Sequence, residues 1–172
     1  WAFDVPSALR LGRALEPYGL MWLEDPTPSA SAPALAKLAS ELPVPLCLGE
    51  ALATRFEFRE ILERGAAHII MPDVASSGGL LEMKKIAALA DTYYVPMAPH
   101  DMVGPLATAA SVQLCLTIPN LLIMEHQLTD VPWRHELTDE PLLVQDGHYA
   151  VPTRPGLGLK LNHDAVRKYR AE

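Results

Sequence analysis

The sequence predicts an α/β fold in which parallel strands alternate with helices, as in one part of a closed barrel. Five apolar runs each end in an ionisable residue: LMWLE at Glu24, PLCLGE at Glu50, HIIMPD at Asp73, VPMAPH at His100 and LLIME at Glu125. These residues are 26, 23, 27 and 25 positions apart (50−24, 73−50, 100−73 and 125−100), about the length of one strand–loop–helix–loop unit. Each run is apolar throughout, as strands are when helices cover both faces of a parallel sheet.

The composition suits a globular protein and excludes several other classes. Of the 172 residues, 49% are apolar and 20% are charged, which allows a folded core. The net charge of −7 and the lack of a basic cluster argue against nucleic-acid binding. No apolar stretch approaches the roughly 18 residues of a membrane span. Cys47 falls in an expected strand and Cys115 in an expected helix, so we predict free thiols and a cytoplasmic location.

Helical spacing of apolar residues places a helix before the first strand and one in each interval that follows. Pro6 and Pro33 fit first turns, and Thr54 is expected to cap the third helix. The expected helices cover 2–17, 33–41, 55–63, a long segment opened by the loop at 76–79, and 104–118. The alternation of strand and helix predicts repeated right-handed crossover units.

The pattern changes after Glu125. The sequence LLVQDGHYAV predicts a hairpin that turns at Asp146–Gly147, and 163–170 predicts a final polar helix. We therefore divide the chain into residues 1–127, part of the barrel, and residues 128–172, a tail that packs on it or belongs to a second domain. A closed barrel needs about eight strands. We thus expect this chain to be part of a longer protein or to pair with another chain.

Glu24 and Glu50 end adjacent strands, where two carboxylates repel each other unless a cation or proton lies between them. Oxygen ligands without cysteine suit a hard cation such as Mg²⁺. The alternative is that each glutamate pairs with an arginine or caps a helix.

Asp73 and His100 end the next two strands, which lie about 4.8 Å apart in a sheet. A carboxylate–imidazole hydrogen bond would make His100 a general base near neutral pH, although a structural histidine is the alternative. Glu125 could stay protonated in a partly apolar barrel mouth and act as an acid, or form a salt bridge with Arg134 or Arg55. His68 is expected to be structural. The Ser76–Gly79 loop fits an anion site or a tight turn equally well.

These motifs resemble the C-terminal part of the enolase superfamily, in its mandelate racemase-like branch. The matching segments are WLEDP (22–26), PLCLGE (45–50), MPDVASSGG (71–79), APHDMVGP (98–105) and PNLLIMEHQ (119–127), with VPWRHEL (131–137) and PGLGLKL (155–161) in the tail. The resemblance covers essentially all of the chain. It implies a TIM-type (β/α)₇β barrel of which this chain holds strands four to eight, together with the C-terminal segment of a capping domain.

The resemblance also implies roles for the strand-end residues. One Mg²⁺ would be held by three carboxylates, of which Glu24 and Glu50 match the second and third, while the first would precede Trp1. Asp73 and His100 match the His–Asp pair of this branch. Glu125 matches the acid that hydrogen-bonds the substrate carboxylate as it becomes an enediolate, a strategy already known for the superfamily.

Our first expectation from this resemblance is a Mg²⁺-dependent dehydratase, a carbon–oxygen lyase that converts a sugar acid of the hexonate or hexarate type into a 2-keto-3-deoxy acid. Sugar-acid dehydration is the commonest activity of the branch. The alternatives are a racemase or epimerase of a 2-hydroxy acid, and an inactive half-barrel with a structural or assembly role. We expect the protein to bind a small carboxylate substrate and to form a homo-oligomer. We expect no nucleic-acid or membrane partner.

Overall fold

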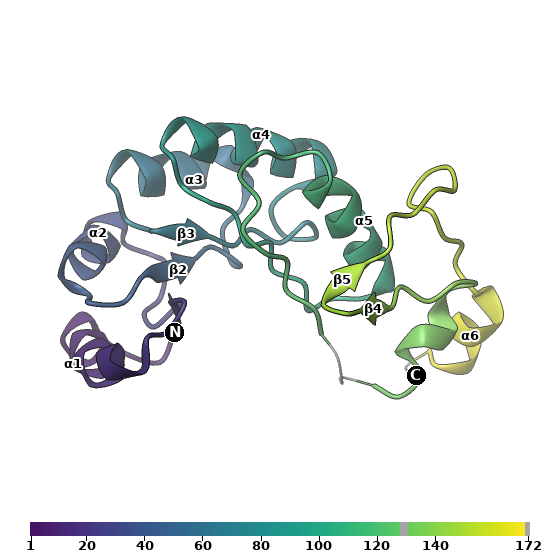
Figure 1. The fold of residues 1–172 in the computed structure, drawn as a ribbon, viewed down its shortest axis with the longest axis horizontal. Helices are drawn as coiled ribbons and strands as arrows, with labels where there is room; N and C mark the ends of the chain where they lie inside the picture. The colour runs from purple at the N-terminus through teal and green to yellow at the C-terminus, as the bar shows by residue number, and fades with distance from the viewer. Residues whose placement is uncertain (128–130, 171–172) are drawn as a thin grey trace.

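The computed structural model describes residues 1–127 and 131–170. Figure 1 shows helices α1 to α5 in an arc, with the strands on its inner side. The helices are α1 (Val5–Leu15), α2 (Ala32–Glu41), α3 (Thr54–Glu63), α4 (Gly79–Thr92) and α5 (Pro105–Cys115), and a 3₁₀ turn, η1 (Glu16–Tyr18), follows α1. The strands between them are β1 (Leu23–Glu24), β2 (Leu46–Leu48) and β3 (Ile69–Ile70). Strand and helix alternate as predicted.

The strands form a parallel sheet in the order β1–β2–β3, so neighbours in the chain are neighbours in space. The fourth and fifth predicted strands are shorter than expected and add only single parallel bridges, Ile70–Met97, Asp73–His100 and Met97–Leu121. Pro96 and Pro99 explain this, because proline has no N–H to donate to a neighbouring strand. All five apolar runs still point the same way, and their carboxyl ends share one rim.

Local hydrogen bonds set where the helices begin. The Asp4 carboxylate accepts from the Ser7 N–H at 2.8 Å and caps α1. The predicted cap at Thr54 is wrong, because Thr54 is the first residue of α3 and no side chain caps from position 53. Instead the Glu57 carboxylate accepts from the Ala53 N–H at 2.6 Å. An acidic side chain in the first turn also interacts favourably with the helix dipole.

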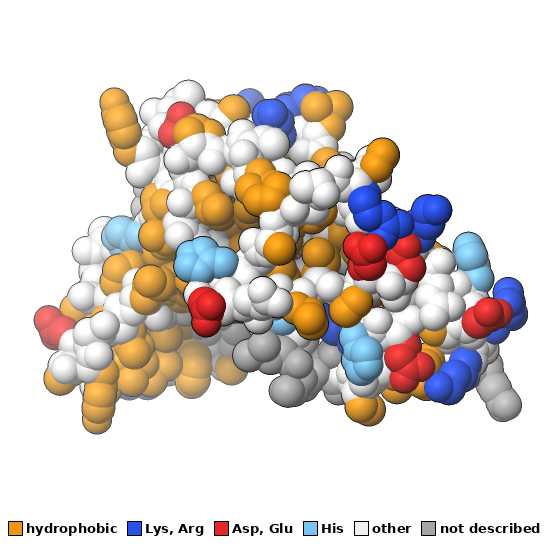
Figure 2. All heavy atoms as spheres, turned by 45° about the vertical axis from the view of Figure 1, so that its right-hand side comes forward, with side chains coloured by type: hydrophobic (Ala, Val, Ile, Leu, Met, Phe, Trp, Pro, Cys, Tyr) orange, Lys and Arg blue, Asp and Glu red, His pale blue; other side chains and the backbone are white. Residues whose placement is uncertain are grey.

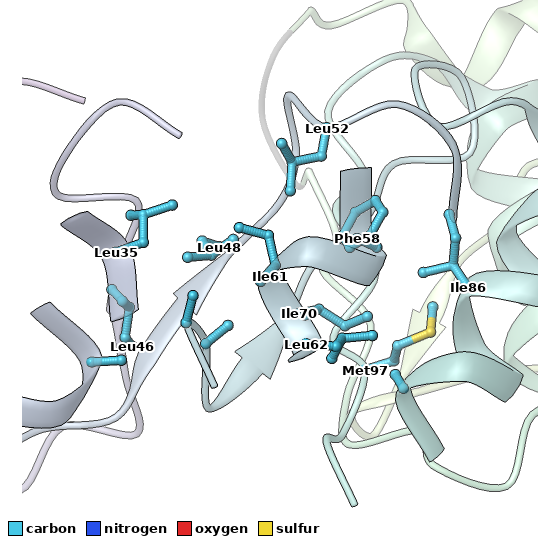
Figure 3. Close-up of a cluster of buried hydrophobic side chains, with 14 of the residues drawn as sticks. Leu35, Leu46, Leu48, Leu52, Phe58, Ile61, Leu62, Ile70, Ile86 and Met97 are labelled. Carbon is cyan, nitrogen blue, oxygen red and sulfur yellow. The ribbon is translucent and has the colours of Figure 1, made fainter. Parts of the chain in front are cut away.

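The core lies between the sheet and the helices. Figure 3 shows strand residues such as Leu48 and Ile70 beside Phe58 and Ile61 of α3, and Phe58 and Ile70 have no exposed surface. Gly49 follows β2 with φ of 131°, and a Cβ there would lie 2.8 Å from Cε1 of Phe58. Only glycine tolerates both conditions, so the packing of Phe58 fixes the turn that carries Glu50.

The tail has its own small elements: a 3₁₀ turn, η2 (Arg134–Leu137), the strands β4 (Val144–Gln145) and β5 (His148–Tyr149), and α6 (His163–Lys168). The predicted hairpin and final helix are confirmed. Trp133 stacks on Tyr169 with ring centroids 4.4 Å apart and joins η2 to the end of α6. Figure 1 shows the hairpin and α6 together beyond α5. Within 1–127 and 131–170, no helix is long and apolar enough to cross a membrane.

Hydrophobic side chains cover much of the face drawn in Figure 2, between scattered charged groups. Large apolar side chains exposed on the molecule include Met21, Leu81, Leu122 and Ile123. Extended apolar surface is typical of faces that contact other protein.

Candidate active site

His100 lies at the centre of the strand-end residues. Its Nδ1 is 2.7 Å from Oδ2 of Asp73, while its Nε2 is 3.3 Å from Oε2 of Glu50 and 3.7 Å from Oε2 of Glu125. Nδ1 therefore faces the buried carboxylate of Asp73, and Nε2 faces two acids of the rim. Three of the other four predicted residues therefore lie around this one imidazole.

The backbone brings Asp73 and His100 together, because the two residues pair directly in a parallel bridge. Asp73 is buried, and its Oδ1 accepts from the Ala75 N–H at 2.6 Å, so both carboxylate oxygens are held. This pairing assigns the proton to Nδ1 of His100, which leaves the lone pair on Nε2. The histidine thus presents a basic nitrogen towards the rim.

Glu125 is oriented by main-chain groups. Its Oε2 accepts from the Asp101 N–H at 2.9 Å, and its own N–H donates to the Pro99 carbonyl at 3.1 Å. The alternative of a salt bridge to Arg55 is wrong, because Arg55 Nη1 binds both oxygens of Glu82 at 2.7 Å. The carboxyl of Glu125 therefore stays at the rim, beside His100.

Glu24 and Glu50 line one open cleft together with Asp25 and Trp1. Oε2 of Glu24 accepts from the Trp22 indole N–H at 3.1 Å. No three His, Cys, Asp or Glu side chains of the described residues are grouped closely enough to hold a metal ion by themselves. Glu24 and Glu50, the two predicted Mg²⁺ ligands, therefore share a cleft without forming a three-residue metal cluster among the described residues.

Charge repulsion at the rim supports the fit of a cation. Burial raises the pKa of Glu50, and the nearby carboxylates of Asp25, Glu24 and Glu125 raise it further, although His100 opposes them. Unneutralised negative charge of this kind, carried by hard oxygen donors, is what a divalent cation such as Mg²⁺ stabilises.

The Asp73–His100 pair carries the opposite shifts. Burial acts to raise the pKa of Asp73, but hydrogen bonds from His100 and from the Ala75 N–H outweigh it and leave this pKa lowered. The hydrogen bond to Asp73 raises the pKa of His100, with smaller contributions from Glu125 and Glu50 and with burial opposing. Asp73 is thus an anion that strengthens His100 as a base.

Two acidic residues at this rim were not predicted from the sequence. Asp25 follows Glu24 directly and is 5% exposed, and its carboxylate accepts from Ser29 Oγ at 3.2 Å and from the Gly49 N–H at 3.4 Å. Asp101 follows His100 directly and is 2% exposed, and burial raises its pKa to about 6. Their only sequence signal is that each stands next to a strand-end residue.

Other candidate residues have structural roles. His68 Nδ1 accepts from the Leu46 N–H at 3.0 Å, as expected of a structural histidine. In the Ser76–Gly79 loop, Ser76 Oγ donates to the Glu50 carbonyl at 2.9 Å and Ser77 Oγ to the Leu52 carbonyl at 3.0 Å. These bonds favour the tight-turn interpretation over an anion site.

A separate cavity of about 510 Å³ lies between α5 and the tail. Its lining includes His126, Arg134 and Thr138 and none of the five strand-end residues. The His126 ring also contacts the Tyr149 hydroxyl, so the side chain of His126 faces the tail and not the rim.

Comparison with known proteins agrees with this architecture. A family model described as "Enolase C-terminal domain-like" matches residues 1–165. The chain is 40% identical over its whole length to D-xylonate dehydratase of Haloferax volcanii, and 34% identical over 95% of its length to D-galactonate dehydratase of Pectobacterium atrosepticum. It spans 42% and 44% of those two proteins, less than half of each.

Among solved structures, a mandelate racemase/muconate lactonizing enzyme-like protein from Rubrobacter xylanophilus superposes with a TM-score of 0.93. That protein is 40% identical, and the match covers 99% of this chain and 44% of the other. The predicted fold class, part of an α/β barrel, is thereby confirmed. With parallel strands whose carboxyl ends share one rim and a family match over nearly the whole chain, this protein belongs to the enolase C-terminal domain-like family.

Proposed function

We propose that the whole protein is a Mg²⁺-dependent acid-sugar dehydratase, and that residues 1–127 supply most of its chemical groups. The observation that carries this proposal is the position of His100, held at Nδ1 by Asp73 and facing Glu50 and Glu125 through Nε2. In this arrangement His100 would be a base that lies beside both a cation site at Glu50 and the acid Glu125. Such an arrangement suits removal of a proton α to a carboxylate. The names of the two curated relatives support a sugar acid as substrate.

The geometry supports a separate proposed role for each of these residues. Glu24 and Glu50 would hold Mg²⁺ together with a ligand outside the described residues. When bound, the cation would stabilise negative charge on the substrate carboxylate. Glu125, oriented by the Asp101 N–H, would donate a hydrogen bond to the same carboxylate. Asp73 would keep His100 in the required tautomer.

The proposed reaction is a net loss of water in which His100 both accepts and returns the proton. The α-proton passes to Nε2 of His100, and the carbon–oxygen bond to the β-hydroxyl breaks. His100 then returns its proton to that oxygen, so that water leaves. The resulting enol tautomerises to a 2-keto-3-deoxy acid.

We also propose three further properties of the protein. Residues 128–172 would form a tail that completes a capping domain, and the protein would assemble as a homo-oligomer, for which the exposed apolar side chains offer contact surface. A cytoplasmic location would suit the two free cysteines, Cys47 and Cys115.

A screen of aldonic and aldaric acids with the full-length protein, Mg²⁺ and D₂O tests the function. The expected result is a 2-keto-3-deoxy acid from one or a few of these substrates. Deuterium uptake at the α-carbon without loss of water would instead identify a racemase. Neither product from any acid would refute the proposed chemistry.

A further inference from the structure

The backbone of Gly49 and Glu50 is held from both neighbouring strand–helix units. On one side, Oδ2 of Asp25 accepts from the N–H of Gly49, the residue before Glu50, at 3.4 Å. On the other side, Ser76 Oγ donates to the carbonyl of Glu50 itself at 2.9 Å. One contact comes from the residue after Glu24, and the other comes from the turn that follows Asp73.

The burial, backbone conformation and hydrogen bonds of Asp25 hold its carboxylate in place for this contact. It is 5% exposed and has a φ of 31°, a left-handed conformation that residues with side chains rarely adopt. Its N–H donates to the Cys47 carbonyl at 3.0 Å, and Ser29 Oγ donates to Oδ1 at 3.2 Å. The backbone turn therefore sends Glu24 towards the cleft and the neighbouring carboxylate of Asp25 inward, towards the Glu50 turn.

The same turn has other contacts: the Leu52 N–H donates to the Gly49 carbonyl at 3.1 Å, and Oε2 of Glu50 lies 3.3 Å from Nε2 of His100. Gly49 has φ of 131° and packs against Phe58, while Glu50 and its side chain lie at the edge of the open cleft. Beyond these contacts, the Thr54 N–H donates to the Ser77 carbonyl at 3.2 Å, which ties the end of the same loop to the 76–79 turn. Asp25 and Ser76 thus hold the two peptide groups on either side of the Gly49–Glu50 pair, one at the Gly49 N–H and the other at the Glu50 carbonyl.

We infer that Asp25 and Ser76 are positioning residues that set the direction of Glu50, and through it the affinity of the proposed Mg²⁺ site. This inference rests on the proposed function for its metal. It assigns a role to two residues outside the ligand set, and it joins the cation side of the rim to the turn after Asp73. Partners that orient a metal ligand are commonly worth about 10- to 100-fold in metal affinity.

The test uses the full-length protein with Asp25→Ala and Ser76→Ala, and Mg²⁺ binding is measured by calorimetry. We expect each variant to weaken Mg²⁺ about 10- to 100-fold, while turnover at saturating Mg²⁺ stays close to wild type. Two matched controls remove the same kind of bond elsewhere. Asp4→Ala removes a carboxylate that accepts from the Ser7 N–H at 2.8 Å, and Ser40→Ala removes a hydroxyl that donates to the Lys37 carbonyl at 2.9 Å. Both controls should bind Mg²⁺ as the wild type does.

A second measurement needs no metal. Amide hydrogen exchange at Gly49 in the metal-free protein should quicken at least about tenfold in Asp25→Ala, because the Gly49 N–H loses its acceptor. Exchange at Thr54 should quicken in Ser76→Ala, because the Ser77 carbonyl that accepts from the Thr54 N–H lies in the turn that loses its bond to Glu50. Unchanged exchange in both variants, or Mg²⁺ affinity equal to wild type in both, overturns the inference. If Asp25→Asn abolished Mg²⁺ binding as fully as Glu50→Gln, Asp25 would be a ligand and the positioning role would be wrong. A wild-type protein that binds no Mg²⁺ would refute the proposed function, and the exchange measurement would then decide the inference alone.

Discussion

Replacing Asp101 by asparagine tests how the rim tolerates a buried acid. Asp101 is 2% exposed, and burial raises its pKa from 3.8 to about 6. The negative charges of Asp73 and Glu125 add to this shift, while Thr108 and Arg134 oppose it. Ionised Asp101 therefore destabilises the folded state, and asparagine removes that charge with little change of shape.

The sign and size of the effect follow from linkage. The folded-state pKa lies above the unfolded value of 3.8, so the stabilisation from holding a proton is fully present below pH 3.8 and is lost as the pH rises through about 6. A difference of about 2 pKa units corresponds to about 3 kcal/mol. About half of this change, roughly 1.5 kcal/mol, falls between pH 5 and pH 8.

Urea unfolding of the full-length protein at pH 5 and pH 8 measures the effect. We expect the unfolding free energy of Asp101→Asn, relative to wild type, to be about 1.5 kcal/mol more favourable to the folded state at pH 8 than at pH 5. Asp91→Asn, the same substitution at an exposed position on α4, serves as the matched control. A difference between Asp101→Asn and wild type that is the same at both pH values would refute the reasoning.

Three further predictions concern the full-length protein. Glu50→Gln should abolish turnover unless excess Mg²⁺ restores it, and full activity without added metal would remove Glu50 from the ligand set. His100→Asn should lower the rate of α-proton exchange in D₂O about 10²- to 10⁴-fold, the usual contribution of a general base, while Mg²⁺ binding is kept; an unchanged rate would show that another group is the base. Phe58→Ala should lower the unfolding free energy by about 3–5 kcal/mol because Phe58 is fully buried, and a loss below about 1 kcal/mol in urea unfolding would contradict the packing described for Gly49.

The sequence located the strand ends well because one short pattern carries the information. A run such as PLCLGE is apolar while it is covered and ends in a charged residue where it reaches the rim. The extent of pairing was harder to predict. Pro96 and Pro99 interrupt the N–H donors of the fourth run, so that run and its neighbour at Leu121 share only a single bridge.

The contacts between units could not be predicted from spacing. The side chains of Asp25 and Ser76 each bond the backbone beside Glu50 from a neighbouring unit. Neither residue has a periodic signal of its own in the sequence. The cap of α3 was missed for a related reason. Thr54 has the side chain of a good cap, but the chain begins the helix one residue early and Glu57 accepts from the Ala53 N–H instead.

Four hydrogen bonds at the rim join neighbouring strand–helix units, and this has a consequence for folding. Asp25 bonds Gly49 across 24 residues, Ser76 bonds Glu50 across 26, Asp73 bonds His100 across 27 and Asp101 bonds Glu125 across 24. Each bond closes a chain loop of nearly the same length, so each step of assembling the rim loses a similar amount of chain entropy. Because that loss grows only with the logarithm of loop length, a four-residue insertion between two rim contacts adds only about 0.1 kcal/mol to the closure. Connecting loops on this scaffold can therefore lengthen and diversify with almost no effect on the ease with which the rim closes.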